Sequence, residues 1–433
     1  MASRPGGGSP LSCDAATISA MSLTVQKFGG TSLADPPKIH RAARRAIRAK
    51  LEGNRVVLVV SAMGRTTDEL LNLARAVCSD PPKRELDMLL TTGEQVSIAL
   101  MAMAIDATGH EAISLTAAQL GLFTDSAHTR ARIQRISRER IDQELAAGKI
   151  VIVAGFQGID ASGEITTLGR GASDTTAAAL AAVLGAEVCE IYTDVDGVYT
   201  ADPRVVPNAR KIEEISYDTM LEMAAAGAGV MHSRAIEFGK KFNVPLHVRS
   251  SQTETRGTII MTETGSMEAI AVQGVTLKED LAFISLNAVP NTPGIAARIF
   301  AEVARNHLLV DDIVQNIYDG GKFASLGFST NAGDAAEART VCEQLAASLG
   351  IGSVEVDEGV SKVSAVGVGM RTHTGIASTM FEALANAEIN IENISTSEIV
   401  ISCIIRREDG PKALRFIHDA FRLGETSNRT GKP

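Results

Sequence analysis

The sequence predicts an α/β fold in which a mostly parallel central sheet is covered by helices on both faces, followed by two smaller βαββαβ units. Strand-like and helix-like segments alternate from Leu23 to about Met261. Beyond Thr262 the pattern changes to short strands and paired helices, and part of this region is repeated. The length of 433 residues is enough for two to three domains, at about 150 residues per domain.

The alternating part contains short apolar runs rich in β-branched residues, which are typical of buried parallel strands. We expect strands at residues 23–27, 55–61, 150–155, 188–193 and 244–248. Between them, Ala-rich stretches predict helices at residues 37–51, 67–78, 95–108 and 175–184. Ligands of such sheets bind at the carboxyl ends of the strands, so motifs that directly follow a strand are candidates for the functional site.

The C-terminal region contains an internal repeat. Residues 292–313 recur as residues 373–394, with six identical residues at the same spacing. Each copy follows a predicted strand, at 282–288 and 363–368, and enters a helix directly after a glycine. This is half of a ferredoxin-like βαββαβ unit, present twice.

The composition excludes several classes of protein. Lys+Arg 42 against Asp+Glu 51 gives a net charge of −9, which argues against polyanionic partners such as nucleic acids and membrane surfaces. The five cysteines are scattered without a C-x-x-C pair, so neither a disulfide framework nor a zinc site is expected. No continuous apolar run approaches the ~18 residues of a membrane span, and the start of the chain does not resemble a signal peptide. We therefore expect a cytoplasmic location.

The first predicted strand ends in Lys27-Phe28-Gly29-Gly30 and runs into a helix. Two glycines at such a turn let backbone N–H groups face an anion, and the lysine adds a positive charge. The turn is not a P-loop, because the chain has no G-x-x-x-x-G-K-[ST] motif. A solvated lysine beside an ordinary turn is the alternative interpretation.

Further polar motifs lie at other strand ends and helix starts. They are Thr92-Gly93-Glu94, Gly155-Phe156-Gln157-Gly158, and the segments 168–176, 193–199 and 201–204. Ser173 or Asp174 could be a simple helix N-cap, and Asp196 with Gly197 an ordinary turn. Neither interpretation explains Arg170, which is flanked by glycines where a planar guanidinium can bind a carboxylate or a phosphate.

One lysine, one arginine, a Gly-rich turn and several carboxylates thus converge on strand ends. Phosphoryl transfer from a nucleotide fits this combination, because its catalysis is mostly positioning and charge neutralisation. The acceptor would best be a carboxylate, which is already ionised and needs no general base.

With these motifs in order, the chain resembles the aspartate kinases of the amino-acid kinase superfamily. The resemblance runs from Leu23 to about Leu423, and the motifs that carry it are residues 25–32, 60–64, 91–94, 167–175 and 190–204. It implies a three-layer kinase sandwich followed by two ferredoxin-like ACT domains. The expected boundaries are a disordered extension over 1–21, a kinase domain over 22–262, a linker with the first regulatory strand over 263–280, ACT domains over 281–358 and 359–424, and a disordered tail over 425–433.

The resemblance also implies an activity: transfer of a phosphoryl group from MgATP to the side-chain carboxylate of L-aspartate, the entry to lysine, threonine and methionine synthesis. The residues implied as catalytic are Lys27, Arg170 and Asp174. Those implied in aspartate binding are Ser61, Glu94, Phe156, Arg170, Gly171, Ser173 and Asp174. Those implied in nucleotide binding are Lys27, Phe28, Gly29, Gly30, Thr193, Asp194, Tyr199, Asp202 and Arg204. Magnesium is expected mainly on the phosphates, and no protein ligand for a metal is named.

Two positions depart from the family pattern. Ala172 replaces the second glycine before Ser173, a small change if that backbone keeps a negative φ. Gly229 replaces a lysine that contacts the nucleotide in the family, and Arg234 or Lys240 could substitute for it. A catalytically weakened amino-acid sensor is therefore the alternative function. Kinases of glutamate or acetylglutamate are a second alternative, which Arg170 and the ACT repeat disfavour.

The ACT repeat implies feedback regulation. End-product amino acids, lysine or threonine or both, are expected to bind the first copy, and the ACT units are expected to pair in a homo-oligomer. The residues implied in effector binding are Asn291, Gly294, Ala296, Gln315 and Asn316. The sequence leaves open which end product inhibits, and whether the assembly is a dimer or a tetramer.

Overall fold

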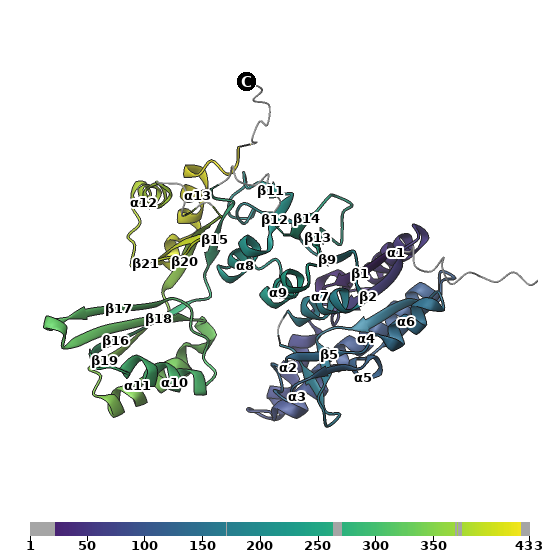
Figure 1. The fold of residues 1–433 in the computed structure, drawn as a ribbon, viewed down its shortest axis with the longest axis horizontal. Coiled ribbons are helices and arrows are strands. Elements are labelled where there is room, and N and C mark those ends of the chain that lie inside the picture. Colours follow the sequence, from purple (N-terminus) through teal and green to yellow (C-terminus); the bar gives the residue numbers. More distant parts are fainter. Residues whose placement is uncertain (1–21, 170, 263–270, 369, 371–374, 426–433) are drawn as a thin grey trace, which may run out of the picture. The chain divides into compact units, whose positions relative to one another are not determined.

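The computed structural model describes residues 22–425 except 170, 263–270, 369 and 371–374 (Figure 1). It contains two compact units: one runs to Asp196 and includes Arg234–Thr262, and the other comprises Gly197–Ser233 and the chain from Glu263 onward. Arg170, the predicted N-terminal extension, residues 263–270 of the predicted linker and nearly all of the predicted tail lie outside the described residues.

The first unit is built on a mostly parallel sheet, as predicted. Its strands are β1 (Leu23–Phe28), β2 (Arg55–Val60), β3 (Ala112–Leu115), β6 (Ile150–Ala154), β9 (Val188–Thr193), β13 (Leu246–Ser250) and β14 (Thr258–Met261). They lie in the order β14-β13-β9-β1-β2-β6-β3, and only β14 runs antiparallel to its neighbour in this series. All five expected strands are present, with ends shifted by at most two residues. The short strands β3, at an edge of the sheet, and β14 were not predicted.

Helices cover both faces of this sheet, which confirms the three-layer prediction. Helices α1 (Pro36–Leu51) and α4 (Thr92–Asp106) pack with the even-numbered side chains of β1, β2 and β6 in one hydrophobic core. Helix α7 (Ala172–Leu184) contacts β1, β2 and β9. Successive strand residues face opposite sides of a sheet, so Phe28 points toward α1 while Lys27 points toward α7.

A small second sheet in the same unit was not anticipated from the sequence. Its strands are β4 (Leu122–Thr124), β5 (Ile133–Ile136), β7 (Gln157–Ile159) and β8 (Ile165–Thr167), in the order β5-β4-β7-β8. Strands of three or four residues carry too little alternation to be recognised by pattern. The remaining helices of this part are α2 (Thr66–Val77), α3 (Lys83–Leu90), α5 (Ala117–Leu120), α6 (Glu139–Ala146) and α9 (Ser233–Phe242), with a 3₁₀ turn, η2, at Gly30–Leu33.

One helical stretch, Lys83–Asp106, is long and apolar enough to cross a membrane by length and composition alone. It comprises α3 and α4, and half of its most apolar window is buried inside the protein. Polar residues such as Thr91 and Glu94 interrupt it, which is why no continuous apolar run is visible in the sequence. A core helix passes the same test, so this stretch is weak evidence for a membrane span.

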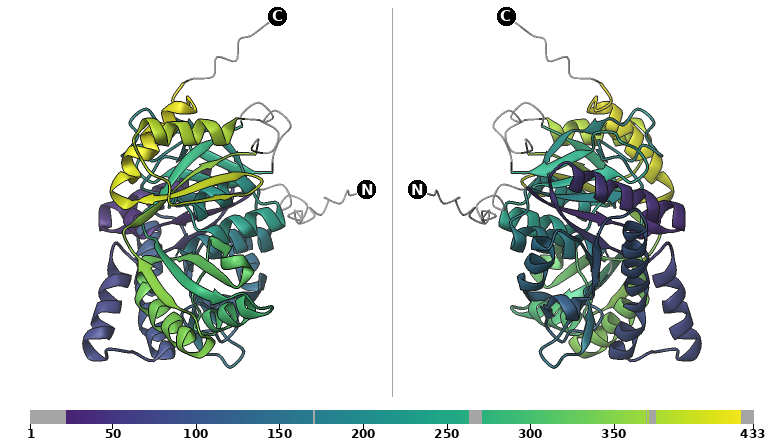
Figure 2. Two further views of the ribbon diagram at one scale, coloured as in Figure 1. Left: turned by 90° about the vertical axis from the view of Figure 1, so that its left-hand side faces the viewer. Right: turned by 90° about the vertical axis from the view of Figure 1, so that its right-hand side faces the viewer.

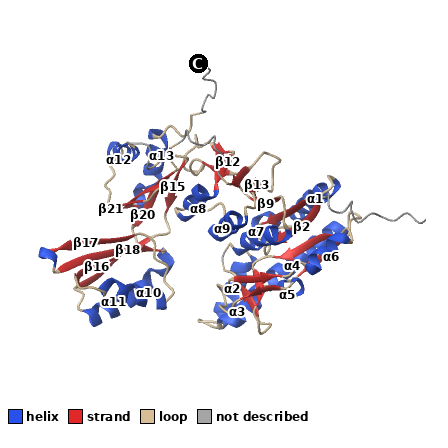
Figure 3. Ribbon diagram, in the orientation of Figure 1, coloured by secondary structure: helices blue, strands red, loops and turns tan. Residues whose placement is uncertain are grey.

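The second unit contains the two ferredoxin-like sheets, each with a pair of helices (Figure 3). The first comprises β16 (Ala282–Pro290), α10 (Ile295–Arg305), β17 (Ile313–Tyr318), β18 (Phe323–Thr330), α11 (Ala335–Leu349) and β19 (Ser353–Asp357), with strand order β17-β18-β16-β19. The second comprises β20 (Val360–Val366), α12 (Ile376–Asn386), β21 (Asn393–Thr396), β22 (Val400–Arg406) and α13 (Gly410–Ala420). Helices α12 and α13 lie side by side against its sheet (Figure 2).

The fourth strand of the second sheet comes from before the first ACT unit. Strand β15 (Gly274–Lys278) pairs antiparallel with β20 and completes the order β15-β20-β22-β21. The first βαββαβ unit is therefore inserted into the second. The other elements of this part are β10 (Val198–Tyr199), β11 (Lys211–Ile212), β12 (Glu214–Ser216) and α8 (Tyr217–Ala225).

The glycine shared by the two sequence repeats has a structural cause. Gly294 precedes α10 with φ 89°, and Gly375 precedes α12 with φ 98°. Residues with a Cβ rarely adopt this left-handed conformation, so a glycine is favoured at the start of each helix. The two repeats therefore share this glycine because each chain segment makes the same left-handed turn before its helix.

Candidate active site

An ion pair between Lys27 and Asp174 lies at the carboxyl end of β1. Lys27 Nζ is 2.6 Å from Asp174 Oδ1, and the side chains are only 11% and 9% exposed. Lys27 is on the strand and Asp174 is in the first turn of α7, so the pair joins the sheet to the helix that covers it. Two charges this far from water stabilise each other only as long as both are present.

The Gly29–Gly30 turn lies beside this pair and is closely packed. A Cβ at Gly29 would be 3.3 Å from Lys27 Nζ, and a Cβ at Gly30 would be 2.8 Å from the carbonyl oxygen of Ala62. The Gly30 carbonyl also accepts a hydrogen bond from the Gly64 N–H at 2.9 Å. Glycine is therefore needed at position 30 for the backbone to approach the loop after β2.

Ser61 and Glu94 approach the same region from β2 and α4. The Ser61 N–H donates to the Phe28 carbonyl at 3.1 Å, and the Ala62 N–H donates to Glu94 Oε1 at 3.0 Å. Glu94 is 2% exposed, and its Oε2 has no hydrogen-bond partner among the described residues. Burial raises the pKa of the Glu94 carboxyl to about 7, against the opposing effect of the Ala62 N–H.

The start of α7 packs against the strand end after β6. A Cβ at Gly155 would be 2.7 Å from Ser173 Oγ, so the glycine allows the first turn of the helix to approach. Gly171 caps α7 with φ 68° and accepts a hydrogen bond from the Asp174 N–H at 3.2 Å. Phe156 has φ 70°, and its N–H donates to Thr176 Oγ1. Ala172 starts the helix with a negative φ, so its replacement of a glycine is accommodated.

Most predicted site residues of the first unit are thus gathered around the ends of β1, β2 and β6. Thr193 ends β9, the strand beside β1, and its hydroxyl donates to Asp194 Oδ1 at 3.1 Å. Arg170 lies outside the described residues. Tyr199, Asp202 and Arg204 belong to the second unit, where Arg204 binds the Asp202 carboxylate through Nε and Nη2. That guanidinium is the leading cause that lowers the pKa of Asp202.

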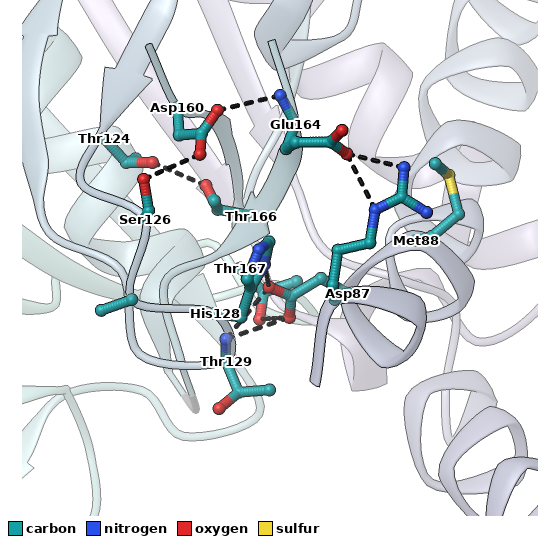
Figure 4. Close-up of polar contacts among 12 residues, drawn as sticks. Asp87, Met88, Thr124, Ser126, His128, Thr129, Asp160, Glu164, Thr166 and Thr167 are labelled. Carbon is teal, nitrogen blue, oxygen red and sulfur yellow. Dashed lines mark hydrogen bonds and ion pairs between the residues drawn. The ribbon is translucent and has the colours of Figure 1, made fainter. Parts of the chain in front are cut away.

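Asp87 is a buried residue of this region that sequence reasoning missed (Figure 4). Its carboxylate, which is 0% exposed, accepts hydrogen bonds from the Thr129 N–H at 3.0 and 3.1 Å and from Thr167 Oγ1 at 2.6 Å. His128 Nδ1 lies 2.8 Å from Oδ2. Thr167 ends β8, three residues before Arg170. Asp87 therefore anchors the strand that leads into the glycine-flanked arginine.

Arg234, in the first turn of α9, binds the same segment. Its Nη1 donates to the Leu168 carbonyl at 2.7 Å and its Nη2 to the Ala131 carbonyl at 3.3 Å. Both Nη atoms thus bind backbone oxygens, which argues against Arg234 as the substitute for the lysine replaced by Gly229. Neither Asp87 nor Arg234 lies directly after a strand, so the strand-end rule could not find them.

The residues present fit a nucleotide phosphate better than a resident metal ion. Lys27 supplies a cation beside the closely packed Gly29–Gly30 backbone, which is the chemistry that phosphates require. Within the described part of the chain, no group of three or more His, Cys, Asp or Glu residues could hold a metal.

Comparison with known proteins decides the family. The amino acid kinase family matches residues 22–250, and an ACT domain matches residues 363–421. The aspartokinase of Bacillus sp. (strain MGA3) is 49% identical over 403 residues, which are 93% of this chain and 98% of that protein. The chain belongs to the aspartokinase family.

Other aspartokinases agree with this assignment. The aspartokinase of Mycolicibacterium smegmatis is 47% identical over 93% of this chain and 97% of its own length. Among solved structures, E. coli aspartokinase III in complex with aspartate and ADP, in its R-state, superimposes with a TM-score of 0.81 at 25% identity, covering 92% of this chain and 99% of that one. The T-state of the same enzyme, with lysine and aspartate, gives a TM-score of 0.71 over the same shares.

We predict that Asp87→Asn raises the KM for aspartate by roughly tenfold and the KM for ATP much less. The amide keeps the size of the side chain but removes the charge that orders Thr129 and Thr167, at a cost of about 1.5–3 kcal/mol. Initial rates measured against each substrate give the two KM values and so test this difference. Glu85→Gln, on the exposed side of α3, is the matched control. A folded Asp87→Asn protein with both KM values unchanged would contradict the role of Asp87.

The raised pKa of Glu94 predicts a pH-dependent stability. The unfolded chain loses the Glu94 proton near the ordinary pKa of 4.5, whereas the folded protein keeps it until the pH reaches about 7. Stability therefore falls as pH rises through this window, by about 3 kcal/mol in total. Glu94→Gln should remove this loss, so the variant gains stability relative to the wild type from pH 5 to pH 8.

Urea unfolding at each pH measures the difference, with Glu69→Gln, at an exposed position of α2, as the control. If the stability difference between Glu94→Gln and wild type is the same at pH 5 and pH 8, Glu94 does not titrate in this range.

Proposed function

We propose that the Lys27–Asp174 pair is the centre at which this aspartokinase transfers the γ-phosphoryl group of ATP to the side-chain carboxylate of L-aspartate. The products would be ADP and L-4-aspartyl phosphate, the first intermediate on the route to lysine, threonine and methionine. The observation that carries this proposal is the nearly buried ion pair beside the Gly29–Gly30 turn at the end of β1. The aspartate and ADP bound to E. coli aspartokinase III support it.

Charge neutralisation is the main task of such a site, because an anionic acceptor must approach an anionic triphosphate. Without substrates, Lys27 is neutralised by Asp174. The ammonium group of bound aspartate offers Asp174 a second cation, which lets Lys27 turn toward the transferring phosphoryl oxygens. The pair therefore exchanges partners on substrate binding, and neither charge is left unpaired in a nearly dry site.

The remaining substrate contacts are those that the family resemblance implies. Arg170 would bind the α-carboxylate of aspartate, and Glu94 would share its ammonium group with Asp174. Ser61, Phe156, Gly171 and Ser173 would line the pocket. Phe28, Gly29, Gly30, Thr193, Asp194, Tyr199, Asp202 and Arg204 would hold ATP, with Mg²⁺ on its phosphates. An ammonium beside Glu94 would lower the raised pKa of that carboxyl and keep it ionised.

The ACT units would make this activity sensitive to end products. We place the effector at the first unit, where Asn291 Nδ2 donates to the Gly321 carbonyl and Gly294 and Ala296 begin α10. Gln315 and Asn316 lie on β17, an edge strand of that sheet. Lysine is bound in the T-state structure of E. coli aspartokinase III, which supports lysine as an effector here, whereas threonine rests on the family resemblance alone.

Self-association through the ACT units has support on the same strand. Ile313, Ile317 and Tyr318 of β17 are 54%, 59% and 44% exposed, and an unpaired strand edge with exposed apolar side chains is a pairing surface. A cytoplasmic location is consistent with Cys78, Cys189, Cys342 and Cys403, which are free thiols in the described part of the chain.

The alternative of a weakened sensor finds no support. The Lys27–Asp174 pair is intact, and the relatives that match more than nine-tenths of the chain are aspartokinases.

We predict that Lys27→Ala lowers kcat on the order of 100- to 1000-fold, as expected when a group that stabilises transition-state charge is removed. Coupled measurement of ADP release gives kcat, and circular dichroism checks the fold. Lys83→Ala, at an exposed position of α3, is the control. Near-normal turnover by folded Lys27→Ala would refute the assigned role.

Feedback control predicts that L-lysine or L-threonine, alone or together, lowers the initial rate at subsaturating aspartate. Gln315→Ala should weaken this inhibition by roughly tenfold in effector concentration while leaving the uninhibited rate unchanged. Equal inhibition of the two proteins would exclude β17 from the effector site.

A further inference from the structure

A polar cavity of ≈ 280 Å³ lies on the α1 face of the central sheet. Its lining includes Gln26 of β1, Glu190 of β9, Arg249 of β13, and Arg45 and Arg48 of α1. Neighbouring residues of a strand face opposite sides, so Gln26 points away from the face that carries Lys27. The cavity is therefore separate from the Lys27–Asp174 site, and the family resemblance gives it no role.

Two arginines in this cavity share a single carboxylate oxygen. Arg45 Nη1 and Arg48 Nη1 lie 3.3 and 3.2 Å from the same Oε2 of Glu254. Arg45 is 6% exposed, whereas the Glu254 side chain is 58% exposed and sits on the irregular segment after β13. Arg45 Nη2 also donates to the Thr253 carbonyl at 2.5 Å, whereas its buried Nε has no partner among the described residues. A buried guanidinium that shares an exposed carboxylate and keeps one N–H unpaired has capacity to bind another carboxylate.

Buried polar atoms without partners line the same space. Arg45 Nε, Arg249 Nε and Gln26 Oε1 are buried and have no hydrogen-bond partner among the described residues. Gln26, which is 2% exposed, already donates through Nε2 to Glu190 at 2.9 Å. Glu190 also accepts from Arg249 Nη1 and from the Tyr192 hydroxyl, so it is fully engaged. Two donors and one acceptor are thus left for an occupant.

We propose that this cavity binds a small carboxylate that also carries a hydrogen-bond donor, such as an α-hydroxy or α-amino acid. The ligand carboxylate takes the place of the Glu254 carboxylate between Arg45 and Arg48, and its hydroxyl or ammonium group donates to Gln26 Oε1. In the absence of a ligand, the Glu254 carboxylate occupies the position that the ligand carboxylate would take. The unpaired guanidinium N–H groups require a carboxylate, and the Gln26 Oε1 acceptor requires a donor on the same ligand, because a carboxylate alone would leave Oε1 without a partner.

The position of the cavity gives the occupant a route to the active site. Arg45 Cζ lies 4.8 Å from the centroid of the Tyr192 ring, and this ring stacks on Phe28 at 4.7 Å with an interplanar angle of 5°. The Tyr192 carbonyl accepts the Gly29 N–H at 3.2 Å. A ligand that reorients Arg45 therefore acts on the ring and strand that support the Gly29–Gly30 turn.

The test compares glycolate and glycine, which carry a hydroxyl and an ammonium group on the α-carbon, with acetate, which has the same carboxylate but no such donor. Saturation-transfer NMR titrations of the full chain measure their affinities. Glycolate and glycine are expected to bind at least about fivefold more tightly than acetate. Arg48→Gln should weaken both by roughly tenfold, because one charged hydrogen bond is lost. Arg44→Gln, on the exposed side of α1, is the matched control and should change nothing.

Glu254→Gln provides a gain of affinity that a misfolded protein cannot imitate. Removing the competing carboxylate should tighten glycolate binding by at least about threefold. The proposal is overturned if no ligand saturates the wild type below about 100 mM, if acetate binds as well as glycolate, if Arg48→Gln binds like the wild type, or if Glu254→Gln does not bind more tightly. None of these outcomes depends on the kinase reaction, so they are independent of the proposed function.

Discussion

The Lys27–Asp174 ion pair is the interaction on which the architecture of the site depends. It fixes the first turn of α7 against the end of β1, and both partners are nearly removed from water. The close approach is possible because α7 begins with small residues and because Gly155 leaves room for Ser173. A nearly buried pair of this kind contributes little net stability, but it is costly to break on one side. The charges of Lys27 and Asp174 thus position each other in the free protein, and the same two charges would bind the substrates.

The end of β8, at Thr167 and Leu168, is held by two groups that come from distant parts of the sequence. Asp87 binds Thr129 and Thr167 from α3, and Arg234 binds the Leu168 and Ala131 carbonyls from α9. Both use charged hydrogen bonds to backbone or hydroxyl groups, which orient a loop more firmly than neutral contacts do. The small sheet β5-β4-β7-β8 carries this segment between them.

In the second unit, the two ACT sheets are joined by a comparable arrangement. Lys362 on β20 is almost fully buried and binds Asp311 and Asp312, which precede β17. Burial alone would lower the pKa of Lys362, but the two carboxylates outweigh it and raise the pKa. Asp312 also accepts a hydrogen bond from Ser395 of β21. The segment before β17 is therefore tied to the second sheet by charged groups, while Phe283 of β16 packs with Val360 and Ile404 in an apolar cluster that also links the two sheets.

The sequence predicts those parts of the molecule whose signal is local. Lys27, Gly29 and Glu94 follow strand ends or open helices, and the five long parallel strands stand out as apolar runs. Asp87 could not be found this way, because it is one charge on an amphipathic helix and its partners lie some 40 and 80 residues away. The pairing of β15 with β20 was equally hidden, because a whole βαββαβ unit separates the two strands in the chain.

The most direct measurement is ATP-dependent formation of aspartyl phosphate by the full chain, trapped as the hydroxamate, with L-aspartate or L-glutamate as the acceptor. The account predicts hydroxamate with L-aspartate and ATP, and none with L-glutamate or without ATP. Absence of aspartyl hydroxamate from well-folded protein at saturating ATP would contradict the account.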